Sequence, residues 1–215
     1  MTEFRLTILT PTTGMMRSAY TVSLANLITY YAQHQVIEGI ENQYLAYHVI
    51  EGSGISSARE KMVAEALETE TTHILFIDED MGFAADTLHR LARRRLPIVG
   101  CNYPMRVKGK GFTALAPGGE RRIVTNAAST GVEPCHYTGF GFCLIERSVF
   151  ERAERPWFLI GYNTKTQQYT TEDAAFARRL PEIGVTWMVD HDASKSLTHV
   201  GPYNYSWKDY EHGTD

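Results

Sequence analysis

Residues 73–81 read HILFIDEDM, a run of mostly apolar residues that leads straight into three acids. A continuous apolar run of this length is typical of a central parallel strand that is covered on both faces. Ligands of an open α/β sheet bind just beyond the carboxyl ends of the strands, where Asp78 and Asp80 follow. Side chains two residues apart in an extended chain point the same way, so we expect these two carboxylates to converge.

Converging carboxylates repel each other unless a cation or a hydrogen-bond donor lies between them. A hard divalent ion such as Mn²⁺ or Mg²⁺ meets this need, because it binds few carboxylates and keeps positions for phosphate oxygens. The pattern therefore indicates a site for a metal and a nucleotide phosphate. The alternative is that Asp78 and Asp80 are solvated loop residues, or that they open the next helix, where negative charge suits the dipole.

Strand-like and helix-like segments alternate on both sides of this stretch. We expect strands at residues 5–10, 44–50, 73–77 and 97–101. The expected helices carry an apolar stripe at Tyr20, Leu24, Leu27, Ile28 and Tyr31, a capping box at Ser57 and Glu60, and apolar positions at Leu88 and Leu91. Such alternation predicts an α/β sheet of the nucleotide-binding kind.

The second half of the chain is less regular. Residues 103–136 read as long loops with short strands, and residues 137–145 are aromatic and glycine-rich and lead into a helix from about Arg147. Another helix should follow Thr171, and residues 185–189 should form a last strand. We therefore expect one domain over residues 1–201, with halves at about 1–101 and 102–201, and an aromatic tail over 202–215.

Composition narrows the protein class further. Of 215 residues, 43% are hydrophobic and 21% charged, which supports a packed core, and the net charge of −4 argues against general nucleic-acid coating. The three cysteines form no C-x-x-C pair, so neither a disulfide framework nor a structural zinc site is expected. No apolar run approaches the length of a membrane span or a signal peptide, so we expect a cytoplasmic protein.

Six short motifs together resemble the GT-A family of glycosyltransferases, in particular its small free-standing phage and bacterial members. They are ILTPT at 8–12, ISSAR at 55–59, LFIDED at 75–80, TGFG at 138–141, TED at 171–173 and LTHVG at 197–201. The resemblance spans about residues 5–201. It implies a GT-A-like nucleotide-binding sheet with an irregular acceptor-side second half, and transfer of a sugar from a nucleotide-diphosphate donor, UDP- or GDP-linked, to a hydroxyl group.

The resemblance also implies a metal site. Asp80 would bind Mn²⁺ or Mg²⁺ directly, and Asp78 would contact the donor ribose or reach the metal through water. His199 would complete the metal shell, and an imidazole among oxygen ligands shifts the preference toward Mn²⁺. The alternative for His199 is a surface histidine or one satisfied within the core.

Donor contacts are implied for two further segments. Thr10, Pro11 and Thr12 would border the nucleobase. Arg59 would lie near the base or the diphosphate, and Glu79 is placed with the donor-binding residues.

Catalysis is assigned by the same resemblance to Glu172 and Asp173, one of which would deprotonate the acceptor hydroxyl. The alternative is that both acids simply stabilise the first turn of a helix that begins after Thr171.

The glycine-rich motif at Gly139, Phe140 and Gly141 would line the sugar and acceptor side, where absent side chains let backbone approach a ligand. The alternative is a bulged strand packed with aromatic residues.

The acceptor is the least determined part. A loop with Arg106, Lys108 and Lys110 could meet a phosphate-bearing acceptor, and some phage relatives glycosylate hydroxymethylated bases in DNA. A polysaccharide or protein acceptor stays open, and so does the interpretation of residues 106–110 as a solvated loop.

A nucleotidyltransferase with the same paired carboxylates is a further alternative, although the chain lacks the glycine-rich phosphate loop with lysine. The third hypothesis is a sugar- or nucleotide-binding module that has no catalytic activity.

Overall fold

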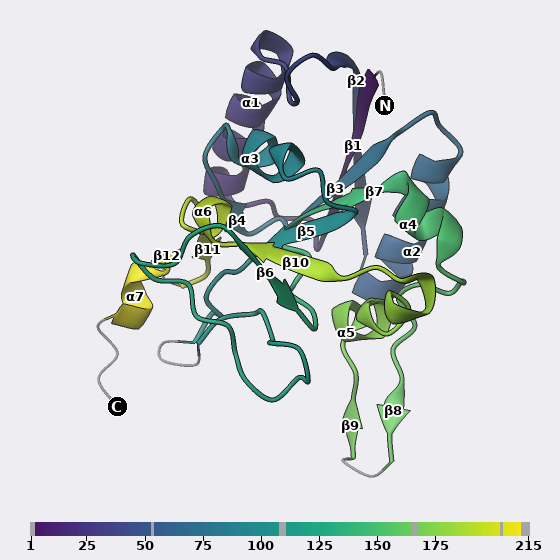
Figure 1. The fold of residues 1–215 in the computed structure, drawn as a ribbon, viewed down its shortest axis with the longest axis vertical. Helices are drawn as coiled ribbons and strands as arrows, with labels where there is room; N and C mark the ends of the chain where they lie inside the picture. The colour runs from purple at the N-terminus through teal and green to yellow at the C-terminus, as the bar shows by residue number, and fades with distance from the viewer. Residues whose placement is uncertain (1–2, 53, 108–110, 165–166, 203, 212–215) are drawn as a thin grey trace.

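The protein is built around a seven-stranded mixed sheet, seen in a computed structural model that describes residues 3–52, 54–107, 111–164, 167–202 and 204–211 (Figure 1). The strand order is β2-β1-β3-β7-β5-β10-β6. The bounds are β1 Glu3–Thr12, β2 Glu41–Glu51, β3 His73–Ile77, β5 Ile98–Cys101, β6 Val132–Cys135, β7 Phe142–Glu146 and β10 Trp187–Asp190. The predicted first-half strands and the late strand are thereby confirmed, with boundaries that shift by a few residues.

Strand direction departs from the expectation at one place. β3 runs parallel to β1 but antiparallel to β7, which lies between β3 and β5. β5 and β10 are again parallel, and β6 closes the edge antiparallel to β10. The predicted parallel setting of residues 73–77 therefore holds on the β1 side only, because a strand from the second half of the chain inserts beside it.

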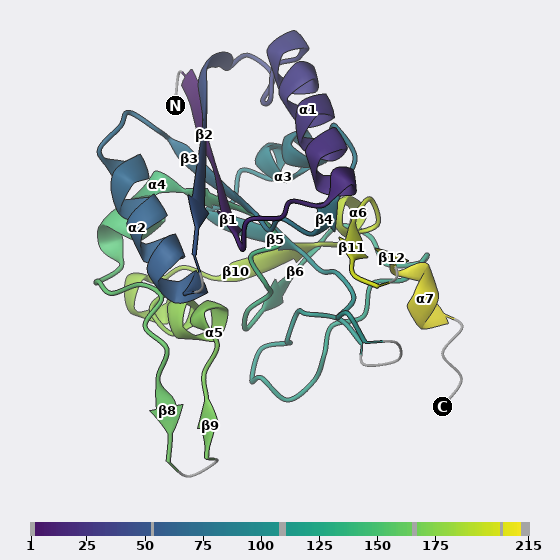
Figure 2. The same ribbon diagram turned by 180° about the vertical axis from the view of Figure 1, so that it is seen from behind.

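Helices cover both faces of the sheet (Figures 1 and 2). One face carries α1 Ser18–Gln33, α3 Thr87–Arg93 and α6 His191–Ser194, and the other carries α2 Ile55–Leu67, α4 Arg147–Arg152 and α5 Glu172–Ala177. β3 is buried along its whole length, and its side chains alternate between the two cores: Ile74 and Phe76 face one, Leu75 and Ile77 the other. This alternation explains why residues 73–77 read as continuously apolar.

The predicted capping box at Ser57 and Glu60 is wrong. α2 begins at Ile55 after Gly54, and no side chain caps it. The Glu60 carboxylate accepts hydrogen bonds from the backbone N–H groups of Trp157, at 2.9 Å, and Phe158, at 3.2 Å. The Glu60 carboxylate thus bonds to backbone groups 97 or more residues away in sequence instead of capping its own helix.

A small second sheet lies beyond the end of β3. It consists of β4 Met81–Gly82, β11 Thr198–Val200 and β12 Asn204–Tyr205, in the order β12-β11-β4 and antiparallel throughout. Its pairing places His199 opposite Met81, and the N–H of Val200 donates to the carbonyl of Asp80 at 2.7 Å. This sheet is what brings the late histidine to the acidic triplet.

The remaining elements are peripheral. Residues 103–107 and 111–136 are mostly loop, as predicted, with isolated bridges such as Leu115 to Tyr137. β8 Tyr162–Asn163 and β9 Gln168–Tyr169 form a projecting hairpin (Figure 1), and Pro181–Ile183 form a 3₁₀ turn. The tail supplies β12 and α7 Lys208–Glu211. None of the helices in the described residues has the length and apolar character of a membrane span.

Candidate functional site

A cleft of about 490 Å³ lies at the carboxyl ends of β1 and β3. Its lining includes Thr12 at the end of β1, the acids 78–80 after β3, Tyr103, Asp173 on α5 and His199 on β11. A shallower hollow of about 590 Å³ beside α1 is lined by small apolar and hydroxyl side chains without a charged residue among them. Only the first of these two hollows gathers groups that can bind ions or move protons, and it lies where ligands of open α/β sheets bind.

Asp80 and His199 face each other in this cleft. The His199 Nε2 atom lies 3.4 Å from the Asp80 Oδ2 atom, and both side chains are largely buried. His199 Nδ1 is 2.9 Å from the carbonyl oxygen of Pro104, so Nδ1 carries the proton that it donates and Nε2 is the nitrogen directed at Asp80. Burial acts to raise the pKa of Asp80, but the hydrogen bond and charge of His199 and the charge of Arg106 outweigh burial and lower it.

Asp78 turns to a different partner. Arg59, which is 1% exposed, donates to Asp78 at 2.7 Å and also ion-pairs with Glu172. The guanidinium carbon lies 4.8 Å from the centre of the Phe140 ring. Burial raises the pKa of Asp78 and the charge of Arg59 opposes that rise, so this carboxylate depends on the arginine for its ionisation.

The Arg59 side chain does not line the cleft but lies beneath it, where it holds Asp78 and Glu172, and its place near the base or the diphosphate stays a prediction. Glu172, one of the two predicted catalytic acids, forms an ion pair with Arg59 and is not among the cleft-lining residues.

Asp173, by contrast, lines the cleft at the start of α5. Its carboxylate is hydrogen-bonded to the Thr171 hydroxyl and accepts from the Ala174 N–H at 2.8 Å. Burial is the largest influence on Asp173 and raises its pKa above the ordinary value. Of the two predicted acids, Asp173 is therefore the one placed to exchange a proton with a bound molecule.

Glu79 fastens the end of β1 to the acidic turn. Its carboxylate accepts from the Thr12 hydroxyl, from the Thr13 N–H at 3.1 Å and from the Thr13 hydroxyl at 2.7 Å. Pro11 and Thr12 line the cleft as predicted for donor-contacting residues. Thr10 does not: it is fully buried, and its hydroxyl lies 2.6 Å from that of Tyr20 on α1. The expectation for Thr10 is corrected because this residue lies two positions before the end of β1, where Tyr20 of α1 packs on its hydroxyl.

The glycine motif surrounds Tyr103, a residue that the sequence did not single out. The Gly141 N–H donates to the Tyr103 hydroxyl at 3.0 Å, and a β-carbon on Gly139 would collide with that hydroxyl. Gly139 lines the cleft, whereas Phe140 is fully buried in the aromatic core and cannot line the sugar side, which corrects its predicted role. Tyr103 lies two residues after the end of β5, and its place after a strand end was the available signal.

The basic loop contributes one described cation to the site. Arg106 Nη1 lies 2.9 Å from Asp80 Oδ2, and its side chain is 51% exposed. Lys108 and Lys110 lie outside the described residues. The other basic cluster, residues 93–95, ends α3, and Arg94 pairs with Asp190 at 2.6 Å and with Asp192 at 2.8 Å.

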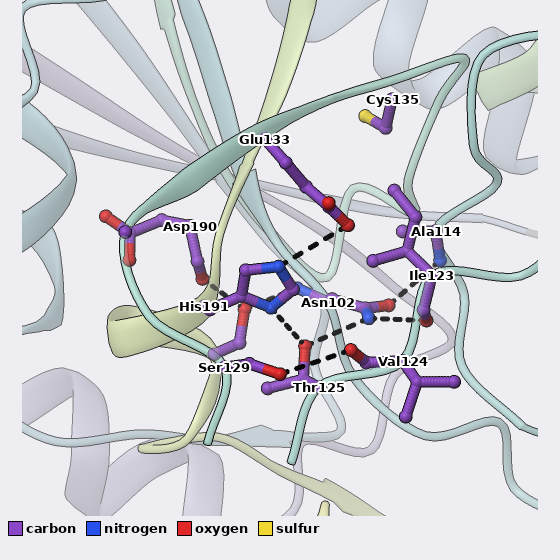
Figure 3. Close-up of polar contacts among 12 residues, drawn as sticks. Asn102, Ala114, Ile123, Val124, Thr125, Ser129, Glu133, Cys135, Asp190 and His191 are labelled. Carbon is purple, nitrogen blue, oxygen red and sulfur yellow. Dashed lines mark hydrogen bonds and ion pairs between the residues drawn. The ribbon is translucent and has the colours of Figure 1, made fainter. Parts of the chain in front are cut away.

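A second polar cluster lies at the β10 and β6 edge of the sheet (Figure 3). His191 Nδ1 is 2.9 Å from the Thr125 hydroxyl, and Nε2 is 3.4 Å from the Glu133 carboxylate. The order of hydroxyl, imidazole and carboxylate is that of a nucleophilic triad. Thr125 is, however, fully buried and also accepts from Asn102 at 3.1 Å, and none of the four lines the cleft. The cluster therefore fixes a loop to the sheet edge.

The residues present fit a divalent cation in part. Asp80 Oδ2 and His199 Nε2 are two suitable donor atoms at a separation that one ion can bridge, and the Pro104 carbonyl orients the imidazole as metal-bound histidines require. Within the described residues, no group of three or more His, Cys, Asp or Glu side chains forms a metal site by itself. Asp78 is held by Arg59, so the remaining ligands would be phosphate oxygens and water.

Comparisons with known proteins place the fold. No protein-family model matches the sequence, and no curated protein matches it. The solved structure of A197 from STIV matches with a TM-score of 0.64 and 16% identity, over 96% of this chain and 92% of that chain. The catalytic domain of Drosophila beta1,4galactosyltransferase 7 in complex with xylobiose matches with a TM-score of 0.50 and 13% identity, over 99% and 81%.

A mutant of the same Drosophila enzyme, in complex with manganese, UDP-Gal and xylobiose, gives a TM-score of 0.49 at 13% identity, over 92% of this chain and 71% of that chain. At such identities the likeness is one of fold. The protein has a mixed α/β, GT-A-like fold, as the sequence predicts.

Proposed function

We propose that this protein is a metal-dependent glycosyltransferase that transfers a sugar from a nucleotide-diphosphate sugar to a hydroxyl acceptor. The observation that carries the proposal is the pair of Asp80 and His199, whose Oδ2 and Nε2 atoms lie 3.4 Å apart in the cleft. The likeness of the fold to that of a galactosyltransferase supports the same assignment.

Asp80 and His199 would hold the Mn²⁺ or Mg²⁺ ion between them. When bound, the ion would stabilise the negative charge that develops on the departing nucleoside diphosphate. The Pro104 carbonyl keeps His199 Nε2 directed into the cleft, where it faces the Oδ2 atom of Asp80.

The donor would lie against the end of β1. Pro11 and Thr12 line this part of the cleft, and Glu79 holds Thr12 and Thr13 in place through three hydrogen bonds. Arg59 acts from below by fixing Asp78 at the cleft floor. These contacts leave the strand end rigid, which favours binding of a flat base beside it at a small entropic cost.

Asp173 would accept the proton of the acceptor hydroxyl. Its carboxylate lines the cleft, and burial raises its pKa, which makes it a stronger base than an ordinary aspartate. The Thr171 hydroxyl and the Ala174 N–H fix its orientation.

A hydroxymethylated base in DNA is the proposed acceptor, with a glycan or protein hydroxyl as the alternative. The basic loop that begins at Arg106 supports DNA, while the xylobiose in the similar Drosophila structure supports a carbohydrate. Binding to hydroxymethylated duplex DNA should weaken steeply with salt if phosphates are contacted. Salt-independent binding would remove DNA from consideration.

Product analysis tests the reaction class. With Mn²⁺ and a panel of UDP-, GDP-, CDP- and TDP-sugars, we expect release of nucleoside diphosphate from one donor, and the same nucleotide should raise the melting temperature. Asp80→Asn should abolish release, whereas Asp86→Asn, which alters an exposed pair on α3, should not. Release of pyrophosphate from a nucleoside triphosphate would show a nucleotidyltransferase instead.

A further inference from the structure

Two positively charged or chargeable groups meet on a single oxygen of Asp80. Arg106 Nη1 lies 2.9 Å from Oδ2, and His199 Nε2 lies 3.4 Å from the same atom. If His199 and Asp80 hold a cation, as the proposed function states, Oδ2 of Asp80 is the oxygen atom that would coordinate it. The guanidinium therefore occupies the very oxygen that the cation needs.

One short segment controls both partners of Asp80. The Pro104 carbonyl accepts from His199 Nδ1, and two residues later Arg106 reaches Asp80. The segment is anchored at its base, since the Thr113 N–H donates to the Tyr103 carbonyl at 2.9 Å. The stem of Arg106 passes over Gly201, where a β-carbon would lie 3.3 Å from its Cδ. The base of the segment is thus held by hydrogen bonding, while the Arg106 side chain is 51% exposed, so open space lies beside it.

A guanidinium and a divalent cation cannot share one carboxylate oxygen without strong repulsion. Arginine is, however, well suited to bind a diphosphate, because its planar fork matches phosphate oxygens in pairs. The displaced side chain needs only a rotation to reach a group bound beside Asp80. The same residue is therefore unfavourable for the cation alone and favourable for the cation together with a diphosphate.

We propose that the Arg106 side chain pairs with Asp80 when no cation is bound. When the cation binds Asp80, Arg106 instead binds the diphosphate of the donor. The inference rests on the proposed function. It makes cation binding and donor binding cooperative, because each ligand gains from the rearrangement that the other requires.

The test compares Arg106→Gln with Arg17→Gln, which removes the same charge from another residue lining the same cleft. Binding of Mn²⁺ alone is measured by electron paramagnetic resonance of the free ion. Arg106→Gln should bind Mn²⁺ more tightly than the natural protein, by roughly three- to tenfold, because a half-exposed competing charge is gone. Arg17→Gln should bind it with nearly unchanged affinity.

The second arm uses inorganic pyrophosphate at saturating Mn²⁺, which avoids any choice of nucleobase. Here Arg106→Gln should bind about tenfold more weakly than the natural protein, since a charge-assisted pair of hydrogen bonds is lost. Opposite signs in the two arms support the proposal. An unchanged Mn²⁺ affinity, an equal effect of Arg17→Gln, or undiminished pyrophosphate binding overturns it.

Asp80→Asn distinguishes a failure of the proposed metal site from a failure of the proposed role of Arg106. If this variant loses Mn²⁺ binding while Arg106→Gln binds as the natural protein does, the metal site stands and the role of Arg106 fails. If Asp80→Asn binds Mn²⁺ normally, the proposed metal site itself is wrong. Circular dichroism confirms folding of each variant before titration.

Discussion

Arg59 and Asp78 form an ion pair of 2.7 Å at the floor of the cleft, with the arginine side chain almost completely buried. The same guanidinium pairs with Glu172 at the start of α5, so it joins α2, the acidic turn and α5 at one point. Two carboxylates thus depend on one cation. The arrangement makes Arg59 a structural centre of the site.

Removing that cation should destabilise the protein strongly. Arg59→Met keeps an apolar side chain at this buried position but removes the guanidinium that contacts Phe140 and leaves Asp78 and Glu172 without their charge partner. We expect a loss of about 3 kcal/mol in the free energy of unfolding, measured by urea denaturation, because the acids are only slightly exposed. Arg90→Met, which breaks an exposed pair with Asp86, should cost less than about 1 kcal/mol. Equal losses in the two variants would contradict this interpretation.

Gly139 should tolerate no side chain while Tyr103 keeps its hydroxyl. A β-carbon at Gly139 would overlap the hydroxyl and lie 3.1 Å from the ring carbon that bears it. Gly139→Ala should therefore lower the free energy of unfolding by about 1–3 kcal/mol. Adding Tyr103→Phe should restore part of that loss in a double-mutant cycle.

A matched control for this clash is Gly161→Ala. The nearest atom there, the Thr170 hydroxyl oxygen, would lie at an ordinary 3.6 Å, so only a small change is expected. If Tyr103→Phe and Gly139→Ala prove additive, the two residues do not act through the contact described.

The pH dependence of transfer should report on Asp173. Because burial raises its pKa, the carboxylate takes up a proton at a higher pH than the roughly 3.9 of a free aspartate. Only the ionised form accepts a proton, so the rate should fall as the pH drops through this raised pKa. Asp173→Asn should lower the rate by about 10²–10⁴-fold and remove this acid limb. A variant that keeps both the rate and the limb would show that Asp173 is not the base.

The sequence predicted the first half of the fold well, because its signals are local. The apolar run of residues 73–77 specifies a strand buried on both faces, and β3 has those bounds. Asp78 and Asp80 then follow at the carboxyl end of the strand and line the cleft. The direction of β7 could not be predicted, because its continuously apolar run fits a buried strand beside either a parallel or an antiparallel neighbour.

The partners of the site residues were less accessible to prediction. Arg59 reads as a ligand-contacting residue from its motif, yet tertiary packing places its guanidinium beneath the cleft. Thr10 and Phe140 belong to motifs that meet the cleft, but both are fully buried. Tyr20 packs on the Thr10 hydroxyl, and the aromatic rings of the core surround Phe140, and neither contact can be read from the local sequence. His199 reaches Asp80 through the pairing of β11 with β4, a contact between segments more than a hundred residues apart.

Anomalous X-ray scattering from crystals soaked in Mn²⁺ shows whether Asp80 and His199 bind one metal ion together. We predict a manganese peak bound by both Asp80 and His199 in the natural protein, and its loss in Asp80→Asn crystals. Crystals that show no peak between these two side chains even with a nucleoside diphosphate present, or a peak bound elsewhere, would contradict the account.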